Sequence, residues 1–450
     1  MDTKVRKAIF TPLLEGNLSA IIPRLTVSCS TGDLVVPATL FSRDDEFIIE
    51  LHLPQPDFPQ EFRLEPRKEC YTKEDCLKIN GEINGEIPFV CDDIYPPSNR
   101  TTRSRGTSTV TLTSNCLQLA SEGTDLQTFA EVSRLLGADR PDDECPAFSA
   151  HLIYHGPELL MPNTVSKTVS ENDFIGSVTT SSFDTYQFEG DGYRGALIER
   201  DNQLHLHVLG EKLSCGTVTQ DDATSIIDSI GHAVGFCFGF NPWPAYREVR
   251  VNHVIVERWI TPRLNLPTTY LAPISGSLWY HLQSNPSDPI HKVIPSIADG
   301  FRNLKERQRQ RLLNLLWHVR CTSSSSVPYS TRLLTICAVL DGMTKLVTDS
   351  EPTDKLSTNM TWKNANYALG LSWEKWTHSI FELWGKYRHK LSHGWLWIDE
   401  ESKSNTFFTD YPVLGCAFHL MAARLCGYNG CVMRDPFKNK IINISDITEE

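Results

Sequence analysis

The sequence has no Cys-x-x-Cys pair among its 13 cysteines, and this odd number suggests neither a disulfide framework nor a zinc ribbon. It also has no unbroken apolar run that approaches the roughly 18 residues of a membrane span. The apolar stretch near the amino terminus is interrupted by Pro12, Glu15 and Asn17, which is unlike the core of a signal peptide. We therefore expect reduced thiols, no membrane contact and a cytoplasmic location.

The charge of the chain is unevenly distributed. Of its 450 residues, 40% are hydrophobic and 22% charged, as in ordinary globular proteins. The formal net charge is −12, but the part before Pro286 has 38 acidic and 23 basic residues, a net charge of −15. An acidic surface repels phosphate, so this front part favours a protein partner over a nucleic acid.

The pattern of apolar residues predicts an α+β fold with a β-rich first part. One helix is expected over Ala223–Phe238, after the capping residues Thr219 and Asp222, and it is expected to pack on a sheet. Residues 1–285 should form a sandwich-like region, either undivided or in two subdomains of about 1–145 and 146–285. Alternation of apolar and polar residues predicts strands at Leu25–Ser28, Asp33–Phe41, Phe47–Leu53, Thr109–Leu117, Phe148–Tyr154, Ala196–Glu199 and Leu204–Leu209.

After the turn-rich residues around Pro286 the periodicity becomes helical. Residues 286–450 are therefore expected to form an all-α bundle. The most regular apolar stripe consists of Trp373, Trp376, Ile380, Trp384, Tyr387 and Leu391. The predicted helices are Val293–Arg307, Gln308–Arg320, Thr331–Val347, Trp373–His393 and Val413–Gly427.

Three familiar patterns lack the context that their chemistry requires. Gly190, Gly192 and Gly195 form a GxGxxG, but a strand rather than a helix follows, which favours a simple turn. His205 and His207 alternate on one strand face without a nearby third ligand, so we expect no metal and no cofactor. His389 and His393 have the spacing of a zinc-protease helix, but Lys390 stands where the general-base glutamate belongs.

The first two predicted helices carry a cluster of basic residues. It is suited to RNA phosphates, although a solvated helix face is the commoner meaning of such a run. Its members are Arg302, Lys305, Arg307, Arg309 and Arg311.

The strongest candidate site lies at the carboxyl-terminal end of the helix with this apolar stripe. Gly394 is a suitable residue to end that helix. At about 100° per residue, Arg388 lies just outside the apolar stripe, while His389 and His393 point to nearly the opposite side. Arg388 offers a planar donor fork for phosphate, and His393 can exchange a proton near neutral pH. The two are about 140° apart on an ideal helix, so a second protomer would be needed to complete a site. A solvated surface is the alternative interpretation.

The motif from Arg388 to His393 consists of an arginine, a polar residue, three more residues and a histidine, and it stands at the end of a bundle helix. It resembles the motif of the HEPN ribonuclease family. The resemblance covers about residues 286–450, and Asp341 resembles the acidic residue that these proteins carry on an earlier helix. It implies metal-independent cleavage of single-stranded RNA by two facing copies of Arg388 and His393, leaving a 2′,3′-cyclic phosphate. His389 and Lys390 would position the RNA backbone, and Asp341 would orient a motif side chain.

A β-rich part followed by a HEPN-like bundle resembles the domain arrangement of the ApeA-type effectors of bacterial phage defence. This resemblance implies a homodimeric toxin that cleaves RNA such as tRNA anticodon loops during abortive infection, after a phage-derived trigger releases it. A protein is the expected trigger. Two alternatives stay open: a catalytically silent HEPN module that binds RNA, nucleotide or a partner protein, and a HEPN chain that a partner nucleotidyltransferase modifies, with Tyr387 as the residue to test.

Overall fold

The computed structural model divides the chain into two compact units. Unit 1 comprises residues 1–155, 203–220 and 244–265, and unit 2 comprises 156–202, 221–243 and 266–450. The boundary expected between 285 and 286 lies outside the described residues. The structure describes residues 6–14, 18–29, 32–43, 46–54, 77–94, 101–104, 107–114, 116–119, 146–155, 185–200, 203–210, 218–240, 243–252, 254–262, 271–273, 292–323, 327–349, 357–392, 404–435, 438 and 440–448.

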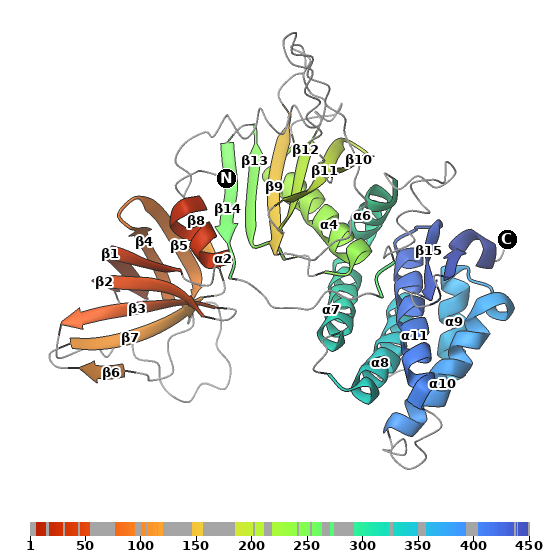
Figure 1. Cartoon of the computed structure of the whole chain (residues 1–450). Coiled ribbons are helices and arrows are strands. Elements are labelled where there is room, and N and C mark those ends of the chain that lie inside the picture. The colour runs from red at the N-terminus through yellow and green to blue at the C-terminus, as the bar shows by residue number, and fades with distance from the viewer. Residues whose placement is uncertain are drawn as a thin grey trace, which may run out of the picture. The chain divides into compact units, whose positions relative to one another are not determined.

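Unit 1 is built on a large antiparallel sheet (Figure 1). A short helical segment, η1 (Arg6–Phe10) and α2 (Thr11–Leu14), precedes it. Within the unit the strand order is β12-β9-β13-β14-β8-β5-β4-β1-β2-β3-β7-β6. The strands are β1 (Ser19–Cys29), β2 (Gly32–Arg43), β3 (Glu46–Pro54), β4 (Leu77–Ile83), β5 (Ile87–Ile94), β6 (Thr101–Ser104), β7 (Thr107–Ser114), β8 (Leu117–Leu119), β9 (Phe148–His155), β12 (Gln203–Gly210), β13 (Tyr246–Val251) and β14 (Val254–Ile260).

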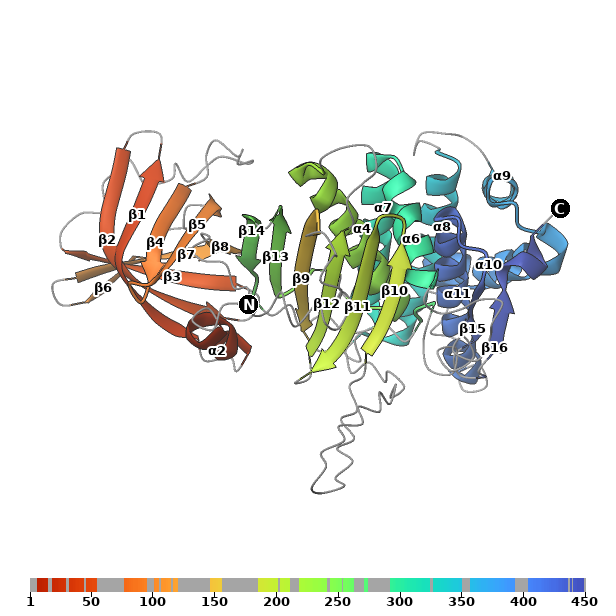
Figure 2. The same ribbon diagram turned by 90° about the horizontal axis from the view of Figure 1, so that it is seen from above.

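The amino-terminal strands of unit 1 curl around a single hydrophobic core. β5 contacts β7 although four strands separate them in the sheet order, and Figure 2 shows the same curvature. Alternate side chains point inward, as in β4, where Leu77, Ile79 and Ile83 are buried. Ile9 and Phe10 of η1 join this core, so the segment before the first strand covers part of the sheet.

Unit 2 begins with a hairpin and then becomes helical. The hairpin strands are β10 (Thr185–Gly190) and β11 (Tyr193–Arg200), and Gly192 has a φ of 76° in the turn between them. The GxGxxG is therefore part of a glycine turn, as the sequence indicated. The helices are α4 (Gln220–Phe238), α6 (Val293–Asn303), α7 (Glu306–Thr322), α8 (Tyr329–Val347), α9 (Thr358–Leu369), α10 (His378–Ser392) and α11 (Ser404–Leu425).

Helix α8 is the centre of the helical part, because it packs against α7, α9, α10 and α11. Its buried side chains include Leu333, Ile336, Leu340 and Met343, which recur at three and four residues. Helix α4 packs against α6 through Phe236 and Phe301, whose ring centroids are 6.2 Å apart. None of the described helices is long and apolar enough to cross a membrane.

Several predicted boundaries were wrong. The helix expected over Val293–Arg307 ends at Asn303, because the backbone of Leu304 is extended and α7 begins at Glu306. The one expected from Trp373 opens with a π-helical turn, η5 (Trp373–Thr377), before α10. Helix α9 was not predicted. The carboxyl-terminal part is also not all-α, since the hairpin β15 (Cys431–Asp435) and β16 (Lys440–Asn443) and the turn η7 (Ile444–Ile447) follow α11.

Candidate functional site at the end of α10

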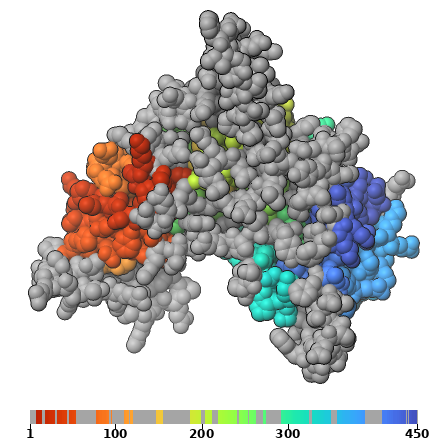
Figure 3. All heavy atoms as spheres, viewed as in Figure 1, coloured from red at the N-terminus to blue at the C-terminus, as the bar shows by residue number. Residues whose placement is uncertain are grey.

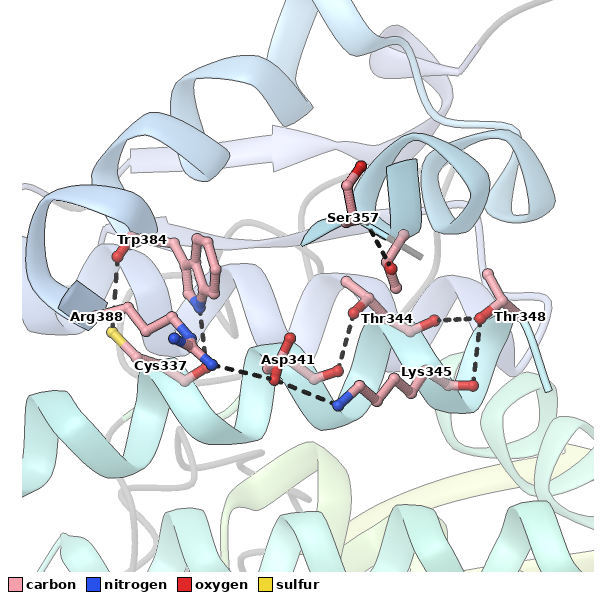
Figure 4. Close-up of polar contacts among 9 residues, drawn as sticks. Cys337, Asp341, Thr344, Lys345, Thr348, Ser357, Trp384 and Arg388 are labelled. Atoms are coloured by element: carbon pink, nitrogen blue, oxygen red, sulfur yellow. Dashed lines mark hydrogen bonds and ion pairs between the residues drawn. The ribbon is translucent and has the colours of Figure 1, made fainter. Parts of the chain in front are cut away.

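The apolar stripe of α10 fixes which way its remaining side chains point. Trp376, Ile380, Trp384 and Tyr387 are all buried. The indole Nε1 of Trp384 donates a hydrogen bond to the carbonyl oxygen of Cys337 on α8, at 2.9 Å (Figure 4). Because this bond joins a side chain of one helix to the backbone of another, it sets the rotation of α10 relative to α8.

One turn after Trp384, Arg388 reaches towards α8. Its Nη2 lies 3.9 Å from Oδ2 of Asp341, and Figure 4 shows the guanidinium extended between the two helices. Its Cζ also lies 5.5 Å from the ring centroid of Trp384, within the range of a cation–π contact. The side chain of Arg388 keeps 48% of its surface exposed, so a guanidinium held on one side can still meet a ligand on the other.

The carboxylate of Asp341 lies close to two cations. Its Oδ2 also lies 3.6 Å from Nζ of Lys345, one helical turn further along α8. Both pairs are exposed enough for water to weaken them, so neither contributes much to stability. Their consequence is geometric: Asp341 gives Arg388 a preferred direction.

The thiol beside this pair is unsuited to nucleophilic chemistry. Cys337 is fully buried, and burial raises its pKa to about 12, although Arg388 acts in the opposite direction. Since the thiolate is the nucleophilic form, a neutral Cys337 serves packing. Any reaction at this position would depend on other groups.

A second polar connection ties α10 to α11. The hydroxyl of Tyr387 donates to Oδ2 of Asp410, and Nζ of Lys386 lies 2.9 Å from the same oxygen. Burial lowers the pKa of Lys386, but its hydrogen bonds to Tyr387 and Asp410 raise the pKa above its ordinary value. Because Tyr387 is only 2% exposed, a modifying enzyme could not reach its hydroxyl in this conformation.

The other residues of the motif are only partly described. His389 and Lys390 lie in the last turns of α10, but the structure does not describe their side chains. His393 and Gly394 lie outside the described residues. Helices α9 and α10 supply part of the surface drawn in light blue in Figure 3. Of the predicted residues, the structure thus brings Arg388 and Asp341 together.

The basic cluster is distributed over the junction of α6 and α7. Arg302 pairs with Asp299 at 3.4 Å, Lys305 pairs with Asp349 at 3.6 Å, and Arg309 pairs with Glu306. Each of these cations therefore has a carboxylate beside it, which reduces the local positive potential. Arg307 is exposed and Arg311 partly exposed on α7.

Sequence analysis missed a different cluster in unit 1. His205 and His207 of β12 are joined by His151 of β9. The strand pattern placed His151 on an alternating strand, but only the pairing of β9 with β12 brings it to the other two. The missing third imidazole was thus present 54 residues earlier in the chain.

Comparisons with protein-family models, with curated proteins and with solved structures found no match to this chain. What the fold defines is an α+β chain with a large antiparallel sheet and a helical carboxyl-terminal part. Any functional assignment therefore rests on the residues at the end of α10 and on the chemistry that they can perform.

Proposed function

We propose that the protein is a metal-independent endoribonuclease of the HEPN type that cleaves single-stranded RNA, with Arg388 and His393 as its catalytic residues. The observation that carries the proposal is the placement of Arg388. It lies in the last turns of α10, half exposed, with Asp341 and Trp384 holding one side of the guanidinium. A permanent cation in a fixed direction is suited to the charge that develops on a phosphate during cleavage.

The chemistry needs few groups because RNA carries its own nucleophile. His393 would remove the proton of the 2′-hydroxyl, whose oxygen then attacks the adjacent phosphorus. The bond from phosphorus to the 5′-oxygen breaks, and that oxygen takes up a proton from water. Arg388 would stabilise the additional negative charge on the phosphate oxygens. The products are a 2′,3′-cyclic phosphate and a 5′-hydroxyl end, and His389 and Lys390 would bind the backbone beside the reacting bond.

Asp341 and Trp384 are positioning residues in this proposal. An arginine side chain has several rotatable bonds, and ordering it on binding costs conformational entropy. The contacts with the carboxylate and the indole restrict those rotations before RNA arrives. The basic residues of α6 and α7, from Arg302 to Arg311, would add a weaker attraction for RNA phosphates.

The same proposal extends to the biological setting, where it rests on the resemblance to phage-defence effectors. A ribonuclease that cuts tRNA would harm its own cell, so it requires a restraint. The β-rich part would keep a cytoplasmic homodimer inactive until a phage-derived protein releases it. Loss of triggered activity after exchange of residues 18–114, which lie wholly in unit 1, for an unrelated domain would support this role, whereas unchanged triggering would contradict it.

The direct test is cleavage of total tRNA in excess EDTA, alone and with lysate of phage-infected cells, by wild type, Arg388→Ala and His393→Ala. We expect cleavage by wild type only, with cyclic phosphates at the new ends. Cleavage that persists in both variants, or that requires a divalent metal, would show that other residues perform the reaction.

A matched pair of variants tests the positioning role. Asp341→Asn removes the carboxylate from both Arg388 and Lys345, whereas Lys345→Ala leaves the Arg388–Asp341 contact in place. We expect the first to slow cleavage by roughly 10- to 100-fold, the usual cost of a misplaced group, and the second to have little effect. Equal effects of both variants would contradict a positioning role for the Arg388–Asp341 contact.

The competing function is a silent module that binds RNA, nucleotide or a partner protein. The observation in its favour is that Asp341 already neutralises part of the charge of Arg388, as in a structural ion pair. A wild type that binds RNA but never cuts it, with or without infected lysate, and an Arg388→Ala variant that no longer binds, would establish that function.

A further inference from the structure

Three histidines meet on one face of the sheet in unit 1. His207 of β12 lies directly opposite His151 of β9, and His205 lies two residues before His207 on the same strand. Side chains two residues apart on a strand share a face, so all three imidazoles project to the same side. β9 and β12 lie side by side in Figures 1 and 2.

The ring nitrogens are close enough to share an ion. One nitrogen from each histidine can be chosen so that all three lie within 4.8 Å of one another, and Nε2 of His151 is 3.1 Å from Nδ1 of His205. Nitrogens bound to one tetrahedral zinc ion lie about 3.3 Å apart, given bonds of 2.0–2.1 Å. The first pair already has this spacing, and the third ring needs a shift of at most about 1.5 Å, within the reach of a side-chain rotation.

The histidines are held in the form that binds metal. The rings of His151 and His207 stack with centroids 4.2 Å apart and planes 18° apart, an arrangement that two charged imidazoliums would oppose. Burial lowers the pKa of His207 to about 3, and burial together with His207 lowers the pKa of His151 well below its ordinary value. Neutral imidazoles keep a lone pair available at neutral pH.

Two buried nitrogens have no other use among the described residues. Nδ1 of His207 and Nδ1 of His151 are both buried without a hydrogen-bond partner. His207 is only 7% exposed, so the cost of burying an unpaired polar atom is not relieved by water there. A bound ion would satisfy Nδ1 of His207, while the partly exposed His151 and His205 leave a route for the ion to enter.

The neighbouring carboxylate is committed to other partners. Glu248 of β13 lies opposite His151 in the register, but its oxygens accept hydrogen bonds from Tyr246 at 2.5 Å, Arg250 at 2.8 Å and Arg258 at 2.9 Å. Among the described residues, the ligand set is therefore three nitrogens. One carboxylate and two guanidiniums leave a net positive charge beside the histidines, which weakens binding of a cation and makes the ion exchangeable.

We propose that His151, His205 and His207 bind a divalent transition-metal ion, with zinc as its natural occupant. Zinc suits three imidazoles with a fourth position open to water. The ion would join β9 to β12 at the point where their side chains meet, and so stabilise this part of the sheet. The three histidines belong to unit 1 and α10 to unit 2, and the test measures metal binding, so it does not depend on the proposed ribonuclease activity.

The test is titration of the chelator-treated, reduced full-length protein with Co²⁺, which replaces zinc and absorbs visible light. We expect the visible bands of a cobalt ion with nitrogen and oxygen ligands, saturating at one ion per chain and abolished by added Zn²⁺. A near-ultraviolet band from thiolate ligands should be absent, since no cysteine belongs to the cluster. Zn²⁺ should also raise the unfolding temperature of the wild type.

Three variants make the assignment specific. His207→Ala should weaken cobalt binding by more than the roughly 10- to 100-fold that follows loss of an outer-shell partner, because it removes a direct ligand. His205→Cys should keep the ion and acquire the thiolate band that the wild type lacks. His318→Ala is the control, since this exposed histidine of α7 lies in unit 2.

The outcomes separate clearly. A wild type that shows no visible cobalt bands, or a His207→Ala variant that binds cobalt as tightly as the wild type, would overturn the site. A thiolate band in the wild type would mean that cysteines bind the ion instead. Because His205→Cys predicts the gain of a signal, a loss of binding through misfolding of His207→Ala cannot be mistaken for support.

Discussion

At the scale of single residues, Glu248 of unit 1 is a buried charge that depends on its partners. It is 5% exposed and is surrounded by the guanidiniums of Arg250 and Arg258, which are themselves buried. Removal of one partner from a buried ion pair leaves an uncompensated charge, which costs more than the intact pair contributes. The Glu248 carboxylate therefore compensates the charge of two buried guanidiniums, and its loss should lower the free energy of unfolding.

We predict that Glu248→Gln lowers the free energy of unfolding by about 3–5 kcal/mol, measured by urea denaturation. The control is Glu306→Gln, which alters the surface pair of Glu306 with Arg309 on α7, where the carboxylate is 63% exposed and the arginine 24% exposed. Its expected cost is much smaller, because water screens an exposed pair. Equal losses in the two variants would show that burial of the charges does not matter.

The pH dependence of the same residue follows from the sign of its pKa shift. Burial alone would raise the pKa of Glu248, but Arg258, Tyr246 and Arg250 together lower the pKa below its ordinary value. A carboxylate with a lowered folded-state pKa stabilises the fold above its unfolded pKa, near 4.3, and loses that contribution as the pH falls through the folded value. The stability difference between wild type and Glu248→Gln should therefore be constant from pH 7 to about 5 and shrink below about 4.

At the scale of elements, a glycine permits a close approach between α6 and the residue that follows α11. A Cβ added at Gly300 of α6 would overlap the carbonyl oxygen of Cys426, just after α11, and would lie 2.6 Å from Cα of that residue. Backbone atoms cannot rotate away as a side chain can. Gly300→Ala must therefore push α6 and the end of α11 apart.

We expect Gly300→Ala to destabilise the protein by about 2–3 kcal/mol, the usual cost of overpacking. The matched control is Gly385→Ala in α10, where a Cβ would meet no atom within 4 Å. That substitution should stabilise by about 0.5–1 kcal/mol, because alanine has the higher helix propensity. Thermal unfolding of both variants provides the comparison, and changes of the same sign would contradict the packing argument.

Local patterns allowed the prediction of elements wherever burial was one-sided. The alternation at Phe47–Leu53 and the stripe of α10 were enough to locate β3 and most of the helix. They were insufficient for β13, in which Arg247, Glu248 and Arg250 are buried between apolar neighbours, so that the strand does not alternate. The hairpin β15–β16 was missed because its strands are too short to show a period.

At the scale of the whole molecule, the candidate functional residues come from segments that no local pattern connects. Asp341 and Arg388 are 47 positions apart and meet because α8 and α10 pack together. The sequence could suggest each of them by analogy, but the distance between them depends on helix packing. The histidines of unit 1 give the stronger example, since two of them were interpreted as a solvated strand face until β9 supplied the third.

The last prediction concerns how many chains make one catalytic site. Arg388 and His393 are about 140° apart on an ideal helix, so a site that needs both would combine Arg388 of one subunit with His393 of the partner subunit. A heterodimer of Arg388→Ala and His393→Ala then contains one intact site and one that lacks both groups.

Co-expression of these two inactive variants in equal amounts should restore about a quarter of the wild-type cleavage, since about half of randomly assorted dimers are mixed and each has one of its two sites intact. Native mass spectrometry measures the fraction of mixed dimers, so the expected activity can be calculated rather than assumed. The control pairs Arg388→Ala with the double variant Arg388→Ala/His393→Ala, which has no intact combination and should stay inactive. A purified mixed dimer without activity would place both groups of the site within one subunit, because each of its chains lacks one of them.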